Sequence, residues 1–166
     1  MTLKKSIKTK NSGFTMIEIL VSILLLGSAL SAVSYAITLN LSNAALVRDS
    51  FVASGLLQEG VEVVTNLRDQ DAFAGNAFGT SMPDGTYRVQ WDSQTLIPLG
   101  GNPTLAKDAA TGMFGYYVGT ATPFTRILTL STIVVNVEKR LTTTVSWSAR
   151  GVTRSISAEK HLYNWQ

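Results

Sequence analysis

Cysteine is absent from the 166 residues, and histidine occurs once, at position 161. Without cysteine the chain has no disulfide, no thiol nucleophile and no Cys-based metal site. A Ser-His-Asp triad would rest on His161 alone, and a surface position on a strand is the simpler interpretation. Asp69 and Asp71 could contribute to a calcium site, but calcium takes six to eight oxygen ligands. We therefore expect no catalytic residue, no cofactor and no metal.

Charged side chains are missing from residues 19 to 47, between Glu18 and Arg48. About 20 apolar residues cross the roughly 30 Å hydrocarbon core of a bilayer, so this run predicts a membrane-spanning helix. Glu18 stands at its edge, where an ionised carboxylate in a bilayer costs on the order of 2.5–3.5 kcal/mol. We therefore expect Glu18 to have a partner.

A basic leader precedes this run and ends in Gly13, which is followed by Phe14. The sequence from Lys10 to Glu18, KNSGFTMIE, resembles the processing site of the type IV pilin and pseudopilin superfamily. The resemblance covers roughly residues 4 to 68. It implies that a prepilin peptidase cuts between Gly13 and Phe14, that Phe14 is then N-methylated, and that Glu18 serves assembly.

The resemblance also implies a function, partners and a location. We expect a structural subunit of a type IV pilus-like filament, and we favour a minor subunit. The expected partners are the prepilin peptidase and methyltransferase, other pilin subunits and the inner-membrane assembly platform. The chain would cross the cytoplasmic membrane once with its head outside the cytoplasm, and would then enter a surface pilus or a periplasmic pseudopilus. In the filament, Glu18 would pair with the methylated amine of Phe14 in a neighbouring subunit.

Several alternatives stay open. The chain could be a pseudopilin of a type II-like secretion system, a pilus-tip head that binds DNA or surfaces, or an unprocessed membrane-anchored binding protein. Residues 28 to 32 offer a small-x-small site for an ordinary signal peptidase, but that interpretation leaves Glu18 without a role.

Two departures from the family pattern limit what the resemblance transfers. Many members carry a proline where this chain has Tyr35, so local melting of the helix after Gly27 in a filament is not implied here. The lack of cysteine likewise rules out the C-terminal disulfide loop of some pilins.

The apparent basicity of the chain comes from its leader. The formal net charge is +3, and four of the 14 basic residues lie in the first 13 positions. Cleavage after Gly13 would leave ten basic and 11 acidic side chains, a net charge of −1. The region from Phe124 to the end is basic and could dock on neighbouring subunits or, less readily, on DNA. Its basic residues are Arg126, Lys139, Arg140, Arg150, Arg154 and Lys160.

The helix is expected to continue beyond the apolar run, because apolar residues recur there at steps of four and three. Gly55 and Gly60 count against this prediction, because each glycine inside a helix is about 1 kcal/mol less favourable than alanine. We predict one helix over residues 14 to 68, first apolar and then amphipathic. Its apolar face is Ala53, Leu57, Val61, Val64 and Leu67.

Residues 69 to 166 are predicted to form a β-rich head, in which residues 92 to 123 are irregular. The turn signal Pro83-Asp84-Gly85 precedes the first strand, and Ala149-Arg150-Gly151 joins the last two. The fold class is therefore α+β, a long helix packed on a small antiparallel sheet. The predicted strands are residues 86–91, 126–137, 141–147 and 152–162. Side chains alternate along the first at Tyr87, Val89 and Trp91, and along the third at Leu141, Thr143, Val145 and Trp147. The tryptophans expected in the core or an interface are Trp91, Trp147 and Trp165.

Overall fold

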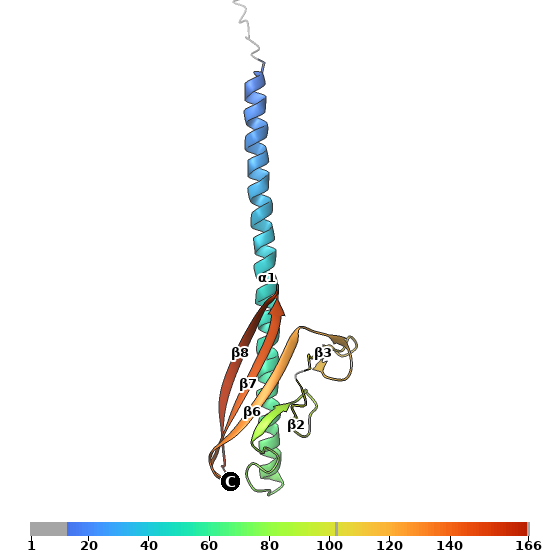
Figure 1. The fold of residues 1–166 in the computed structure, drawn as a ribbon, viewed down its shortest axis with the longest axis vertical. Coiled ribbons are helices and arrows are strands. Elements are labelled where there is room, and N and C mark those ends of the chain that lie inside the picture. Colours follow the sequence, from blue (N-terminus) through green and yellow to red (C-terminus); the bar gives the residue numbers. More distant parts are fainter. Residues whose placement is uncertain (1–12, 102, 166) are drawn as a thin grey trace, which may run out of the picture. The chain divides into compact units, whose positions relative to one another are not determined.

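The computed structural model describes residues 13–101 and 103–165. One helix is followed by eight strands in this part of the chain, an α+β, pilin-like architecture (Figure 1). The chain divides into two compact units, Met1–Ala45 and Leu46–Gln166. Helix α1 (Met16–Phe73) begins in the first unit and ends in the second, and each unit is described by itself.

The first unit contains the apolar half of α1. An 18-residue window of the helix has a mean hydropathy of 2.2, and none of that window is buried. By length and composition this helix can cross a membrane, as predicted. Four hydroxyls in the run donate to backbone carbonyls of the preceding turn, so these four are satisfied without water. These donors are Ser22, Ser28, Ser31 and Thr38, at 2.7–3.0 Å.

The second unit is built on a five-stranded antiparallel sheet in the order β2-β1-β6-β7-β8. Its strands are β1 (Gly85–Arg88), β2 (Ile97–Pro98), β6 (Phe124–Val134), β7 (Glu138–Ala149) and β8 (Val152–Tyr163). The turn between β7 and β8 holds Arg150 at φ 55° and Gly151 at φ 75°, the left-handed pair that a two-residue hairpin needs. The predicted turn is confirmed there.

A second sheet lies in the stretch that was expected to be irregular. It has three short strands in the order β4-β3-β5, and strand β2 of the main sheet also falls in this stretch. The bounds are β3 (Ala106–Lys107), β4 (Phe114–Gly115) and β5 (Thr120–Ala121). The residues are therefore less irregular than predicted, because strands of two residues are too short to leave a period in the sequence.

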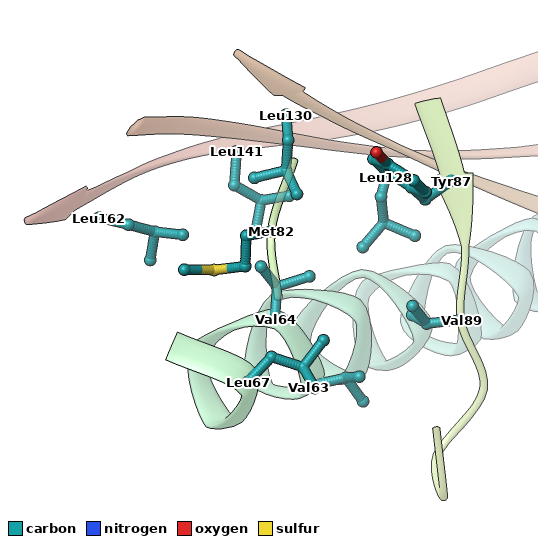
Figure 2. Packing of buried hydrophobic residues seen from close by; sticks show 10 residues of the cluster. All are labelled: Val63, Val64, Leu67, Met82, Tyr87, Val89, Leu128, Leu130, Leu141 and Leu162. Carbon is teal, nitrogen blue, oxygen red and sulfur yellow. The ribbon is translucent and has the colours of Figure 1, made fainter. Parts of the chain in front are cut away.

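The buried face of α1 is shifted from the predicted one. Leu57 and Val61 are only half-buried. The fully buried positions are Ala53, Leu56, Gly60, Val63, Val64, Leu67 and Asp71. Val63, Val64 and Leu67 belong to one buried cluster with Met82 and side chains of the sheet, and Figure 2 shows Val64 directed toward Met82.

Gly60 explains the shift, because it lets the helix approach the sheet closely. A Cβ at this position would lie 3.1 Å from Thr143 Cγ2 and 3.2 Å from Arg126 Cδ. The sequence counted Gly60 only as a weak point of the helix, whereas the structure uses its missing side chain for packing.

Arg126 is buried completely on the inner face of β6. Its Nη1 donates to the carbonyl of Leu56 at 2.8 Å and lies 2.9 Å from Glu59 Oε1 in an ion pair. Its Nη2 donates to the carbonyl of Val89. One side chain therefore ties α1 to β6 and to the segment after β1, a role that no sequence pattern indicated.

Replacing Glu59 by alanine should destabilise the second unit, because it leaves the buried guanidinium without its counter-charge. We expect a loss at the lower end of about 3–5 kcal/mol, since Glu59 itself keeps some exposure. Glu62→Ala, at an exposed position on the same helix, should change stability by less than about 0.5 kcal/mol. Urea unfolding of the detergent-solubilised chain, followed by near-ultraviolet circular dichroism, measures both. Equal losses for the two variants would contradict the role given to this ion pair.

Candidate assembly and processing site

The Gly13–Phe14 bond lies in a segment without regular structure, just before α1 begins at Met16. A Cβ added to Gly13 would meet no atom within 4 Å, and Phe14 is 78% exposed. Among the described residues, no side chain covers this bond, so an enzyme can reach it. The leader lysines lie outside the residues that the structure describes.

Glu18 lies in the first turn of α1, where it forms a capping box with Thr15. The backbone N–H of Glu18 donates to Thr15 Oγ1 at 3.3 Å, and the N–H of Thr15 donates to Glu18 Oε2 at 3.5 Å. Such reciprocal bonds satisfy amides that the first turn leaves unpaired, and a carboxylate there also complements the helix dipole. The Thr-x-x-Glu spacing is a known sequence signature of a helix start, so Thr15 could have been identified from the sequence.

No described cation lies within ion-pair distance of Glu18. The ion pairs of residues 13–101 and 103–165 use six other carboxylates. The side chain is exposed, and its bond to Thr15 is at the long limit for a hydrogen bond. The carboxylate is therefore available to a stronger, charged partner.

Helix α1 runs without a break past Gly27 and Tyr35. Gly27 has open space around its Cα, and Tyr35 is 67% exposed. The exposed apolar side chains on both sides of this segment offer a surface that lipid or other helices can cover. The chain by itself keeps the segment helical.

Asp71 does not have the surroundings that a calcium ligand needs. It belongs to the last turns of α1, which extends beyond the predicted end at residue 68, and it is buried. Its oxygens accept bonds from the backbone N–H and the hydroxyl of Ser81, at 2.8 and 2.7 Å. Asp69 pairs with Arg68 at 2.7 Å. Within the described residues, no three His, Cys, Asp or Glu side chains are placed to hold a metal.

The basic residues after Phe124 do not form one exposed patch. Arg126 is buried, and Lys139 is nearly so. Lys139 Nζ lies 2.7 Å from Asp84 Oδ1, and this contact, together with bonds from Thr132, lowers the pKa of Asp84 to about 2. Two of the six basic residues are therefore buried and paired with carboxylates, so they are not available to DNA phosphates, and this weakens the case for DNA binding.

His161 lies on the outer face of β8, the position expected for a surface histidine. Its Nδ1 lies 2.5 Å from Glu138 Oε1, and its Nε2 lies 3.1 Å from Glu159 Oε1. Hydrogen bonds to Glu138 first and Glu159 second raise the pKa of His161. No serine nucleophile contacts this histidine in the described part of the chain, so the arrangement is a surface ion-pair cluster.

The family comparison bears on the N-terminal residues. Residues 8–34 match the model of the prokaryotic N-terminal methylation motif, and this range contains Gly13, Phe14 and Glu18. No curated protein and no solved structure matches the chain. The motif is a type IV prepilin-type signal, and with the apolar helix it indicates membrane anchoring.

The single histidine makes the surface cluster directly measurable. We expect the pKa of His161 in the folded chain to lie above its ordinary value of 6.5. A raised folded pKa means that the cluster stabilises the fold below the unfolded pKa and loses this contribution as pH rises through the folded pKa. Nuclear magnetic resonance of the imidazole C–H follows the titration. Glu138→Gln should lower the pKa more than Glu159→Gln, and the reverse order would show that the contacts are assigned wrongly.

Proposed function

We propose that this chain, whose methylation motif indicates a type IV pilin-like or pseudopilin protein, is a structural subunit of a pilus-like filament. It is made as a membrane-anchored precursor and is cut between Gly13 and Phe14. The observation that carries the proposal is the charge-free stretch of α1 over residues 19 to 47, whose most apolar window is exposed and which directly follows a carboxylate inside the methylation motif. We favour a minor subunit.

The first step is insertion into the cytoplasmic membrane. The leader lysines favour a cytoplasmic N-terminus, because positively charged flanks stay on that side. The apolar part of α1 then spans the bilayer, and the second unit follows outside the cytoplasm. The self-bonded hydroxyls of this helix support the step, since a bilayer supplies no water to satisfy them.

The second step is the creation of a cation for Glu18. Cleavage after Gly13 turns the backbone nitrogen of Phe14 into an amine, which stays positively charged after methylation. This amine is a better partner for the carboxylate than the N–H of Thr15, because it carries a full positive charge and the bond from Thr15 is long, at 3.5 Å. We assign the pairing to a neighbouring subunit, so that two charges are neutralised when the helices come together.

The third step is the transfer of α1 from lipid into a filament core. Apolar side chains gain little from leaving lipid for protein, because lipid tails are as apolar as leucine. Apolar burial alone therefore does not drive assembly or fix the register between helices. An unpaired carboxylate in the bilayer does both, since only the register that brings it to a cation removes its cost.

Processing is tested by the mass of the native protein. In the native host, intact-protein mass spectrometry should find a chain that begins with N-methylated Phe14. Gly13→Val, which adds a branched side chain at the cut, should leave a chain that begins at Met1. A native chain that still begins at Met1, or that begins after residue 32, would refute processing at this site.

Assembly is tested by Glu18→Ala, which removes the charge. We expect this variant to be cut and membrane-bound but to enter sheared filaments at least about tenfold less than the wild type, because 1.4 kcal/mol already corresponds to a factor of ten. Thr15→Ala is the matched control, since it removes the helix cap and keeps the carboxylate. Immunoblots of filament and membrane fractions give the ratio. Wild-type incorporation of Glu18→Ala, or equal losses for both variants, would exclude the proposed pairing.

A further inference from the structure

A hollow of about 190 Å³ opens on the second unit, beside the small β4-β3-β5 sheet. It is smaller than the roughly 300–1,000 Å³ of a pocket for drug-sized molecules, so it suits a small head group. Its lining comes from the segment after β1 and from the loops of the small sheet. The lining residues used below are Gln90, Trp91, Asp92, Asp108, Met113 and Tyr117.

Two aromatic rings at this hollow are exposed to solvent. Trp91 is 52% exposed and Tyr117 is 68% exposed, whereas Trp147 in the core is 3% exposed. The alternation of the sequence predicted Trp91 on the same side of a strand as Val89, in the core or an interface. Strand β1 ends at Arg88 instead, and the chain turns at Trp91, which directs this residue to the hollow.

Two carboxylates line the same hollow, and neither has an ion-pair partner in the described part of the chain. Asp92 Oδ1 accepts a bond from Gln90 Nε2 at 2.7 Å, and its other oxygen accepts none from residues 13–101 or 103–165. Asp108 accepts bonds from its own loop, which lower the pKa of this carboxyl and keep it ionised. The described residues that line the hollow include no lysine or arginine. The site therefore carries two uncompensated negative charges.

The floor of the hollow is held in place. Gln90 Oε1 accepts the backbone N–H of Tyr116 at 3.1 Å, while its amide group donates to Asp92. The backbone N–H of Gln90 donates to Ser93 Oγ at 2.9 Å. These bonds fix the segment that carries Trp91 and Asp92, so a ligand would meet a preformed arrangement.

We propose that this hollow binds an organic ammonium group. Aromatic faces attract cations through their quadrupoles, and quaternary ammonium groups are recognised in this way. Asp92 and Asp108 add the negative charge, and the apolar side chain of Met113 accommodates methyl groups. A neutral sugar would stack on the rings but would leave both charges unpaired. This site does not depend on cleavage or assembly, so it stands apart from the proposed filament function.

The test uses the full chain in a polyoxyethylene detergent, which has neither an ammonium group nor a sugar. A Trp165→Phe background leaves Trp91 as the exposed tryptophan to be followed by fluorescence. Choline should give a saturable change in roughly the millimolar range, and dimethylbutanol, its uncharged isostere, should bind at least about tenfold more weakly. Equal binding of the two, or no saturation with choline, would overturn the proposal.

Variants assign the binding to the hollow. Asp92→Asn and Tyr117→Ala should each weaken choline binding about five- to tenfold. Glu62→Gln removes an unpaired acid elsewhere, and Phe73→Ala removes an exposed ring elsewhere, so both should bind as the parent does. Far-ultraviolet circular dichroism confirms that each variant is folded, and unchanged binding by both hollow variants would refute the site. Glycerophosphocholine distinguishes the two sources of an ammonium group. Tighter binding than choline indicates a lipid head group, and weaker binding indicates a free organic ammonium compound.

Discussion

An exposed apolar helix with no charge over residues 19 to 47 is the constraint on which the N-terminal chemistry depends. Exposing such an apolar surface to water is unfavourable, so the helix requires lipid or other helices around it. In either medium every polar group must find a partner inside the helix, and the hydroxyls of Ser22 and Thr38 bond to backbone carbonyls. Glu18 is the charged group at the edge of this run, and its carboxylate has only the long bond from Thr15. The cut proposed between Gly13 and Phe14 would create an amine four residues before Glu18 in the sequence.

The second half of the same helix meets the opposite requirement. It gains stability by burying one face against a sheet, and Gly60 permits the close approach. Arg126 then fixes the contact, because its guanidinium bonds to the carbonyl of Leu56 and pairs with Glu59. Buried ion pairs contribute less to net stability than their contacts suggest, since desolvation offsets the attraction. Their specificity is greater, because a helix in another register would leave the arginine uncompensated.

Sequence periodicity predicted the elements that have long regular patterns. Alternation over Leu141, Thr143, Val145 and Trp147 identified the buried face of β7, and all four side chains are buried. Periodicity could not identify Arg126, because a charged residue counts as polar in any pattern. It also placed Trp91 on the same face as Val89, because alternation does not reveal that the strand ends at Arg88. The cap at Thr15 could be predicted from its spacing to Glu18. The burial of Asp71 could not, because it depends on Ser81, which lies ten residues further along the chain.

The buried arginine also connects the packing of the helix to the hollow beside the small sheet. Arg126 Nη2 donates to the carbonyl of Val89, and the next residue, Gln90, forms the floor of the hollow. The backbone carbonyl of Arg126 accepts a bond from the hydroxyl of Tyr116, and the backbone N–H of Tyr116 donates to Gln90 Oε1. The segment that carries Trp91 is thus held by the same side chain that positions α1 on the sheet. A change that loosens Glu59 from Arg126 would therefore reach the hollow through the hydrogen bond from the Arg126 side chain to the carbonyl of Val89. Gly13, Phe14 and Glu18 share no bond with this network among the described residues.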